Sequence, residues 1–166
     1  MSDVVPLAPD LAAYLTSRIS VQVGACDDDG FTSVVRALGA RVSGDQCRVT
    51  ILMGRSQAEP VLAMLRANGK IAVVFSHPVS HRTVQLKGRD AALEAATPAD
   101  EATLGPYAVA MAGHLAADDV PEAVARALVS CAPGDLIAVS FTPSEAYGQT
   151  PGPGAGQRLT PPANPS

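Results

Sequence analysis

Residues 49–89 read VTILMGRSQAEPVLAMLRANGKIAVVFSHPVSHRTVQLKGR, and this stretch decides the fold. The apolar run at its start predicts a strand that enters a helix at Gly54-Arg55-Ser56. The continuous apolar run IAVVF predicts a second strand that is buried on both faces. A break at His77-Pro78 separates it from a third strand that continues toward Arg89. The stretch therefore predicts a strand, a helix and two further strands in succession.

The helix of this unit has recognisable signals at both ends. Ser56 and Glu59 have the spacing of a capping box, and Asn68-Gly69 is typical of a left-handed helix end. Pro60 is tolerated there because the first turn has few intrahelical donors to lose. Free N–H groups, the helix dipole and Arg55 together favour a phosphate or carboxylate at the helix start. An ordinary capped helix with an exposed arginine explains the same pattern, so both interpretations stay open.

The third strand separates cleanly into two faces. Val84 and Leu86 point one way, and the polar row points the other way: Thr83, Gln85, Lys87 and Arg89. A solvated face, a ligand-lined face and a subunit-facing surface all produce such a row.

The chain up to residue 53 predicts a short helix and three antiparallel strands, the last of which is the strand that opens the stretch quoted above. The helix begins at Pro9-Asp10, and the strands cover residues 19–25, 31–42 and 47–53. The acidic sequence at residues 27–30 joins the first two strands. It lacks the alternate ligands and the distal Glu of a calcium loop, so a solvated hairpin turn is the better interpretation.

Arg36 is the unusual residue of the second predicted strand. By alternation it shares a side with Val34, Leu38, Ala40 and Val42, which places a guanidinium in an apolar row. Such a charge needs a partner or an exit to solvent. An ion pair with an acidic residue, snorkelling to the rim of the sheet and an anionic ligand are equally compatible with the sequence.

The second half of the chain turns helical before one last strand. Pro98, Pro106 and Pro121 mark three predicted helix starts, and these helices should pack outside the sheet. His114 has no second histidine at ligand spacing, which favours a packing or surface role. Residues 136–142 (LIAVSFT) predict a closing strand. The sequence from Gln149 on is too rich in Pro and Gly for regular structure, and its last residues should be disordered and dispensable for folding.

Composition excludes several classes of protein. The 166 residues have a net charge of −4, the 12 Lys and Arg residues form no run, and aromatic residues make up only 4%. A surface that binds nucleic acid needs clustered cations and stacking rings, so no nucleic-acid partner is expected. The three cysteines have no Cys-x-x-Cys spacing, which indicates buried free thiols rather than disulfides or a metal site. The acidic start and the lack of a long apolar run predict a soluble, cytoplasmic protein without a membrane partner.

The order of elements predicts a mainly β protein with attached α-helices (α+β) that forms a barrel. We expect one domain over residues 1–148 and a Pro/Gly-rich C-terminal tail over residues 149–166. No G-x-G-x-x-G or P-loop sequence follows a strand, so a dinucleotide fold is not indicated.

The arrangement resembles the FMN-binding split barrel of the pyridoxamine 5'-phosphate oxidase-like family. The resemblance covers roughly residues 11–142 and rests on SVVRAL (33–38), on ILMGRS through LRANGKIAVVF, and on HRTVQLKG (81–88). The closing phrase FTPSEAYGQTPGPGAG is also similar to the end of some members. The resemblance implies a split β-barrel, FMN as cofactor, and a homodimer that holds the flavin at its interface.

The resemblance also implies roles for individual residues. In the family an Arg on the strand corresponding to residues 33–38 contacts the flavin phosphate, which would give Arg36 its partner. Ser56 with Arg55 is the nearest equivalent of the phosphate-binding helix start, although the family's Ser-Arg-Lys aligns with Glu59-Pro60-Val61. Arg82 matches a flavin-contacting Arg, and Thr83 replaces a Gln-type contact. The rest of the predicted cofactor set lies on the same polar row, at Gln85 and Lys87.

The leading functional hypothesis is a flavin-dependent oxidoreductase that acts on a small molecule of unknown identity. The sequence names no catalytic acid or base, and His77 and His81 are the candidates near the polar strand. The alternative is a non-enzymatic ligand-binding or dimerising module on the same fold, with haem, another cofactor or none. The segment Glu59-Pro60-Val61 favours the alternative, and Arg36 favours the flavin.

Overall fold

The computed structural model describes residues 6–159, and residues 1–5 and 160–166 lie outside it. The prediction of a disordered, dispensable chain end therefore falls largely outside the described residues. The elements in chain order are α1 (Pro9–Leu15), β1 (Ser20–Cys26), β2 (Thr32–Arg36), β3 (Gly39–Val42), β4 (Val49–Gly54), α2 (Arg55–Asn68), β5 (Ile71–Ser76), β6 (Thr83–Gly88), β7 (Ala92–Ala95), α3 (Pro98–Leu115), η1 (Ala116–Asp118), α4 (Glu122–Leu128), β8 (Leu136–Phe141), β9 (Glu145–Gly148) and β10 (Gln157–Arg158).

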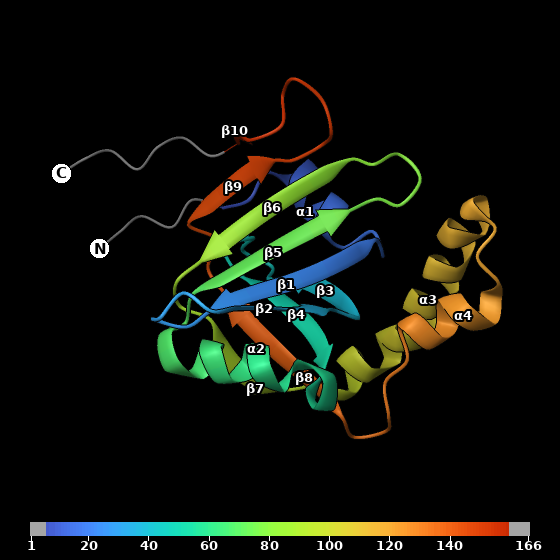
Figure 1. The fold of residues 1–166 in the computed structure, drawn as a ribbon, viewed down its shortest axis with the longest axis horizontal. Coiled ribbons are helices and arrows are strands. Elements are labelled where there is room, and N and C mark those ends of the chain that lie inside the picture. The colour runs from blue at the N-terminus through green and yellow to red at the C-terminus, as the bar shows by residue number, and fades with distance from the viewer. Residues whose placement is uncertain (1–5, 160–166) are drawn as a thin grey trace.

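The strands form two antiparallel sheets with a common core. Sheet A has the order β10-β9-β6-β5-β1-β2, and sheet B has the order β3-β4-β8-β7. α2 runs along one edge of the strands, and α3 with α4 extends to one side of them (Figure 1). This mixed α+β architecture confirms the predicted fold class. No helix within residues 6–159 is long and apolar enough to cross a membrane.

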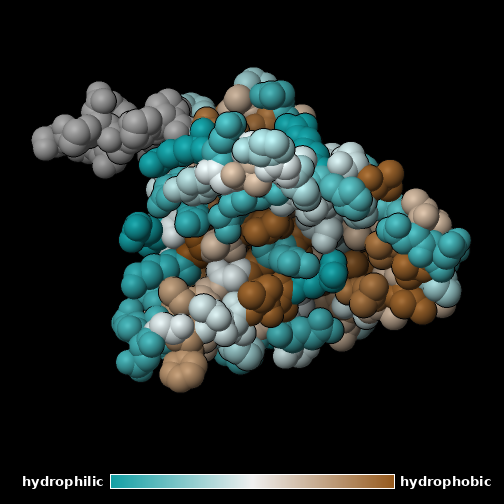
Figure 2. Space-filling model, turned by 45° about the horizontal axis from the view of Figure 1, so that its top comes forward, coloured by the Kyte–Doolittle hydropathy of each residue, from teal (hydrophilic) through white to brown (hydrophobic). Residues whose placement is uncertain are grey.

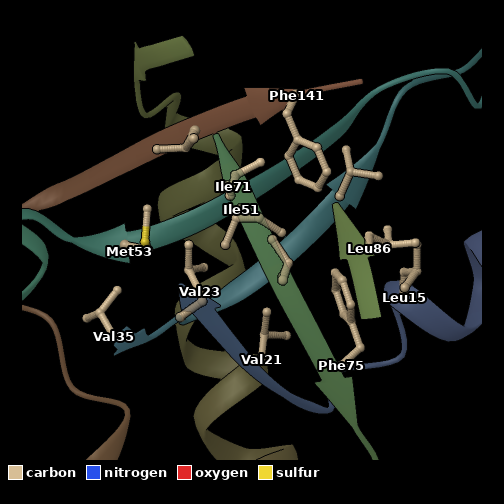
Figure 3. Close-up of a cluster of buried hydrophobic side chains, with 14 of the residues drawn as sticks. Leu15, Val21, Val23, Val35, Ile51, Met53, Ile71, Phe75, Leu86 and Phe141 are labelled. Carbon is tan, nitrogen blue, oxygen red and sulfur yellow. The ribbon is translucent and has the colours of Figure 1, made fainter. Parts of the chain in front are cut away.

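Aliphatic and aromatic side chains from both sheets fill the space between them. Val23, Ile51, Phe75, Leu86 and Phe141 are fully buried in this core, and Figure 3 shows them converging from strands of both sheets. Such close packing of apolar side chains is the main source of folding free energy.

A smaller cluster lies on the other face of sheet B. Leu52 and Leu136 point there and pack with Tyr107 and Met111 of α3. Every residue of β4 and β8 is consequently buried. By contrast, alternate residues of β5 are only half-buried, so the prediction that IAVVF is buried on both faces is wrong. α3 covers the outer face of sheet B, α2 packs against strands of both sheets, and most of the outer face of sheet A stays open.

Two other predicted elements are corrected. The strand expected over residues 31–42 is two strands, because β2 pairs with β1 in sheet A whereas β3 pairs with β4 in sheet B. The chain changes sheets at Leu38, whose N–H donates to the carbonyl of Leu52. The tail is not wholly irregular either, since Gln157 and Arg158 form β10 and pair with β9.

Pro106 does not begin a new helix but lies inside α3. Contacts on both sides of the proline hold the helix together. Before it, Asp100 is buried and forms an ion pair with Arg41 at 2.9 Å. After it, the hydroxyl of buried Tyr107 donates to the carbonyl of Ile19 at 2.9 Å. Helix starts predicted at Pro98 and Pro121 are confirmed, with α4 beginning one residue after Pro121.

Candidate cofactor site

The outer face of sheet A brings together side chains of four strands, most of them polar. The register places Gln22 opposite Arg36 and Val74, and places Val74 opposite Gln85. These four residues form one transverse row across β2, β1, β5 and β6. Figure 2 shows this side of the molecule, with hydrophobic residues near the centre of the face and others over α3 and α4.

A cavity of about 390 Å³ opens at the α3 end of this face, and we call it the Arg36 cavity. Its floor consists of sheet residues, and its wall consists of apolar side chains from the helices. The lining residues are Ser20, Gln22, Arg36, Val74, Ser76, Pro78, Thr83, Met111, Leu115 and Leu128. The volume lies within the range of small-molecule pockets, roughly 300–1,000 Å³.

Arg36 is half-buried in this cavity and keeps most of its donors available. Its Nη1 donates to Ser20 Oγ at 3.1 Å, and no acidic residue within residues 6–159 forms an ion pair with it. The expected apolar row is wrong, because Val34 is 66% exposed and Leu38 lies after the end of β2 and packs in the smaller cluster on the other face of sheet B. Strand β2 instead directs Arg36 to the outer face, where the open cavity lets a guanidinium remain hydrated.

Hydroxyl groups line the same cavity as Arg36, and the buried phenol of Tyr107 feels its charge. Ser76 Oγ and Thr83 Oγ1 share a hydrogen bond of 3.0 Å across β5 and β6. Burial raises the pKa of Tyr107 to about 12, although the charge of Arg36 acts to lower it. Tyr107 is thus neutral at physiological pH and does not neutralise Arg36.

The other residues of the polar row continue along the sheet away from this cavity. Gln85 accepts a weak hydrogen bond from Gln149 Nε2 at 3.4 Å. The Lys87 ammonium lies 5.1 Å from the centre of the Tyr147 ring. The structure therefore places Thr83, Gln85 and Lys87 on one face, as the sequence alternation predicts, and the sheet register brings Arg36 to the same face.

Arg82 lies on the opposite side of β6. Its guanidinium stacks 4.2 Å above the ring of Tyr14 from α1, and its carbonyl accepts the Tyr14 hydroxyl. This arginine does not line the Arg36 cavity. A guanidinium over an aromatic ring has its attractive partner already, so Arg82 has a structural explanation.

The start of α2 is occupied by a carboxylate of the protein itself. Asp135 accepts hydrogen bonds from the Ser56 N–H at 3.0 Å and from the Ser56 hydroxyl at 2.7 Å. The predicted capping box is wrong, because α2 begins at Arg55 without a side-chain cap and Glu59 pairs with Arg66 at 2.6 Å. Asp135 supplies the negative charge that the helix N-terminus favours, and neither Arg55 nor Ser56 lines the Arg36 cavity.

Several functional positions were missed by sequence reasoning. Ser20 and Ser76 enter the Arg36 cavity, and only the strand alternation of ISVQVGA and IAVVFS could have indicated them. His114 meets His77, with ring centroids 4.7 Å apart. Burial lowers the pKa of His114, and the neighbouring His77 lowers it further.

No group of three potential metal ligands occurs within residues 6–159. The acidic sequence at residues 27–30 forms a hairpin turn in which Asp27 accepts from the Asp29 and Phe31 N–H groups. The three cysteines are free, as expected, but they are half-buried rather than buried.

Sequence comparisons find no relative of this chain: no protein-family model matches it, and no curated protein is significantly similar. Comparison of structures does find proteins of similar fold. HupZ from Group A Streptococcus has a TM-score of 0.54 and 13% identity, with 90% of this chain and 100% of HupZ covered. A putative pyridoxamine 5'-phosphate oxidase from Lactobacillus delbrueckii has a TM-score of 0.52 and 15% identity, with 86% and 93% covered. An F420 reductase has a TM-score of 0.51 and 15% identity, with 86% and 98% covered.

Sequence identities of 13–15% are too low to transfer an activity. The structural similarity, with TM-scores of 0.51–0.54, establishes the architecture. The chain adopts the split-barrel fold of pyridoxamine 5'-phosphate oxidase-like proteins.

Proposed function

We propose that this protein binds FMN on the outer face of sheet A and acts as a flavin-dependent oxidoreductase on a small molecule. Arg36 anchors the flavin phosphate in this proposal. The polar row of β6 supports the rest of the cofactor, and a homodimer in the cytoplasm is the working form.

The Arg36 cavity is the observation that carries the proposal. A half-buried guanidinium without an acidic partner in the described part of the chain contacts the hydroxyl of Ser20, and the hydroxyl-bearing side chains of Ser76 and Thr83 line the same cavity. A planar guanidinium can bind phosphate through two parallel hydrogen bonds, and hydroxyls can donate to the remaining oxygens. The lining contains no carboxylate that would repel a phosphate. The residues present therefore fit the phosphate end of FMN.

The polar row offers contacts for the remainder of the cofactor. Gln85 and Lys87 follow Thr83 at two-residue steps along β6, and each step advances roughly 6.6–6.8 Å along the strand. An elongated ligand that is anchored at Arg36 would meet these side chains in succession. When bound, the flavin supplies the hydride or electron transfer, and the protein positions and shields it.

The structural relatives support a redox function of this type. They include a putative pyridoxamine 5'-phosphate oxidase and an F420 reductase. The structural match includes 93% and 98% of these two proteins and 86% of this chain, so the similarity extends over the complete barrel.

The homodimer is supported by exposed large apolar residues at the β1–β2 edge of sheet A. Phe31 is 73% exposed in the β1–β2 connection, and Val34 is 66% exposed on β2. Clusters of large apolar side chains at a surface are typical of protein interfaces. A second copy would cover them together with part of the polar row.

The absorption spectrum of the purified protein tests the proposal, followed by titration with FMN and with riboflavin. Riboflavin has the same ring system without the phosphate, so the difference between the two affinities measures the contribution of the phosphate. We expect a flavin spectrum or saturable FMN binding, and weaker binding of riboflavin. Equal affinity for both ligands would contradict phosphate anchoring, and no binding of either would overturn the proposal.

One observation favours the non-enzymatic alternative, a ligand-binding or dimerising module. Asp135 occupies the α2 N-terminus, which removes one of the two phosphate contacts that the sequence suggested. A module that holds haem, another cofactor or none would give no flavin spectrum. The same measurement therefore separates the two functions.

A further inference from the structure

The outer face of sheet A has a second cavity of about 500 Å³, which we call the Ala72 hollow. It lies toward the opposite end of the strands from the Arg36 cavity. Its lining residues come mainly from β1, β2, β5 and β6 and are Gly24, Ala25, Cys26, Thr32, Ser33, Val34, Lys70, Ile71, Ala72, Lys87, Gly88, Arg89, Ser144 and Glu145.

Two small residues in register create this hollow. Gly24 of β1 pairs with Ala72 of β5, so the middle of the sheet lacks large side chains there. Their outer partners are larger: Val34 lies across from Gly24 on β2, and Lys87 lies across from Ala72 on β6. The result is a shallow, flat floor of backbone and small side chains between two raised edges.

The hollow carries positive charge in an otherwise acidic protein. Lys70, Lys87 and Arg89 line it against a single carboxylate, Glu145, whereas the whole chain has a net charge of −4. Focusing of one sign of charge in a concave site raises the local concentration of the opposite ion.

These cations are not neutralised by strong ion pairs. Lys70 pairs with Asp28 at 3.3 Å, and the Asp28 side chain is 81% exposed, which makes the pair weak in water. Arg89 forms no ion pair with any residue in the range 6–159. Glu145 accepts a hydrogen bond from the Tyr147 hydroxyl, and this bond together with the charges of Lys87 and Arg89 lowers its pKa, so it stays ionised and offsets one of the three positive charges. Net positive charge therefore remains for a ligand.

We propose that the Ala72 hollow binds a flat, apolar small molecule with an anionic group, such as an aromatic carboxylate or sulfonate. The flat floor accepts the ring system, and Lys70 and Arg89 receive the anion. The site does not require the flavin, because Arg36 is absent from its lining. Its place on the same face as the Arg36 cavity makes it suited to the second reactant if the proposed flavin function holds.

Two fluorescent probes of matched shape test this inference. 8-Anilinonaphthalene-1-sulfonate carries an aromatic body and a sulfonate, and N-phenyl-1-naphthylamine has the same body without the charge. Ala72→Leu fills the hollow from its floor without entering the core, because Ala72 lies on the outer face. The double variant Lys70→Met with Arg89→Met removes two cations and keeps their apolar stems. Its matched control is Arg66→Met with Arg126→Met, two exposed cations outside the hollow.

We expect Ala72→Leu to weaken binding of both probes by about tenfold or more, since most of the apolar contact is lost. The double variant should weaken only the sulfonate probe, by about fivefold, as two screened charges would. The control pair should bind both probes as the parent does. Circular dichroism verifies the fold of each variant.

Three results would overturn the inference. Unchanged sulfonate binding in Ala72→Leu would place the probe elsewhere. Displacement of the probe by FMN in the parent but not in Arg36→Met would make the hollow part of the flavin site. If sedimentation shows that the protein is a dimer and the probe binds only to dissociated monomer, this face is covered by a second copy of the chain. Probe binding that survives in Arg36→Met, where FMN binding fails, would keep this inference separate from the proposed function.

Discussion

Replacement of Arg36 by methionine is the sharpest test of the candidate site. Methionine keeps an apolar stem of similar length and removes only the charged, hydrogen-bonding end. In the structure this end makes one hydrogen bond, to Ser20, and no ion pair with any residue from 6 to 159. Because β2 holds Arg36 on the outer face of sheet A, the substitution leaves the core intact and should not unfold the protein.

The magnitude follows from the kind of contact that is lost. A hydrogen bond to a charged group contributes about 1.5–3 kcal/mol, so Arg36→Met should weaken FMN binding by about 10- to 150-fold. Riboflavin has no phosphate, and its affinity should change by less than about twofold, well under the 1.4 kcal/mol that a tenfold change requires. Titration of flavin fluorescence measures both affinities, and circular dichroism checks folding.

Two other arginines provide matched controls. Arg55→Met should have little effect because Asp135 already occupies the helix start beside it. Arg82→Met should also spare FMN binding, since this arginine stacks on Tyr14 on the opposite face. The reasoning is refuted if folded Arg36→Met binds FMN as tightly as the parent, or if Arg55→Met weakens binding more than Arg36→Met does.

Three further predictions concern packing, pH and assembly. A Cβ atom at Gly88 would lie 2.5 Å from Phe141 Cδ2, so Gly88→Ala should lower the Tm by about 2–12 °C, whereas Gly113→Ala in α3 meets no atom within 4 Å and should raise it. Burial acts to raise the pKa of Asp100, but hydrogen bonds and the charge of Arg41 lower it overall. This carboxylate therefore stabilises the fold at pH values above its unfolded pKa, and it loses that effect as pH falls through its lower folded pKa. Urea unfolding at pH 7 should show that Asp100→Asn lowers the free energy of unfolding by about 1.5–3 kcal/mol, and the difference should be smaller in acid. Sedimentation at micromolar concentration should show a homodimer, and a pure monomer would contradict the proposed assembly.

Alternation along a strand was the most informative sequence signal. It correctly divided β6 into Val84 and Leu86 on the core side and Thr83, Gln85 and Lys87 on the outer side. This succeeds because a strand with one buried face has a strict period of two. A different signal, the continuous apolar run, failed for IAVVF. Its residues are apolar on both faces, but the face with Ala72 and Val74 is half-buried and borders the two cavities. Apolar composition alone cannot distinguish a core face from a ligand-binding face.

Arg36 was selected by an argument that the structure corrects in part. The sequence suggested a charge in one continuous apolar strand, but the chain changes sheets at Leu38, and Val34 is exposed. Such a change of sheet depends on two separate pairings, of β2 with β1 and of β3 with β4, which alternation along one segment does not reveal. Ser20 and Ser76 were missed for the same reason, because their approach to Arg36 arises from sheet register and not from local spacing.

The α2 N-terminus shows why the candidate phosphate site belongs to the sheet. A helix start attracts one anion with its free N–H groups and dipole. Here the Asp135 carboxylate already accepts the Ser56 N–H and supplies the negative charge. The segment Glu59-Pro60-Val61 adds a further carboxylate on the first turns of the same helix and no cation. A phosphate at this position would face an existing carboxylate at the donors it needs, which is unfavourable on electrostatic grounds. In the Arg36 cavity the guanidinium has no such competitor in its lining, and we therefore infer that any phosphate-bearing cofactor of this protein is held by sheet A.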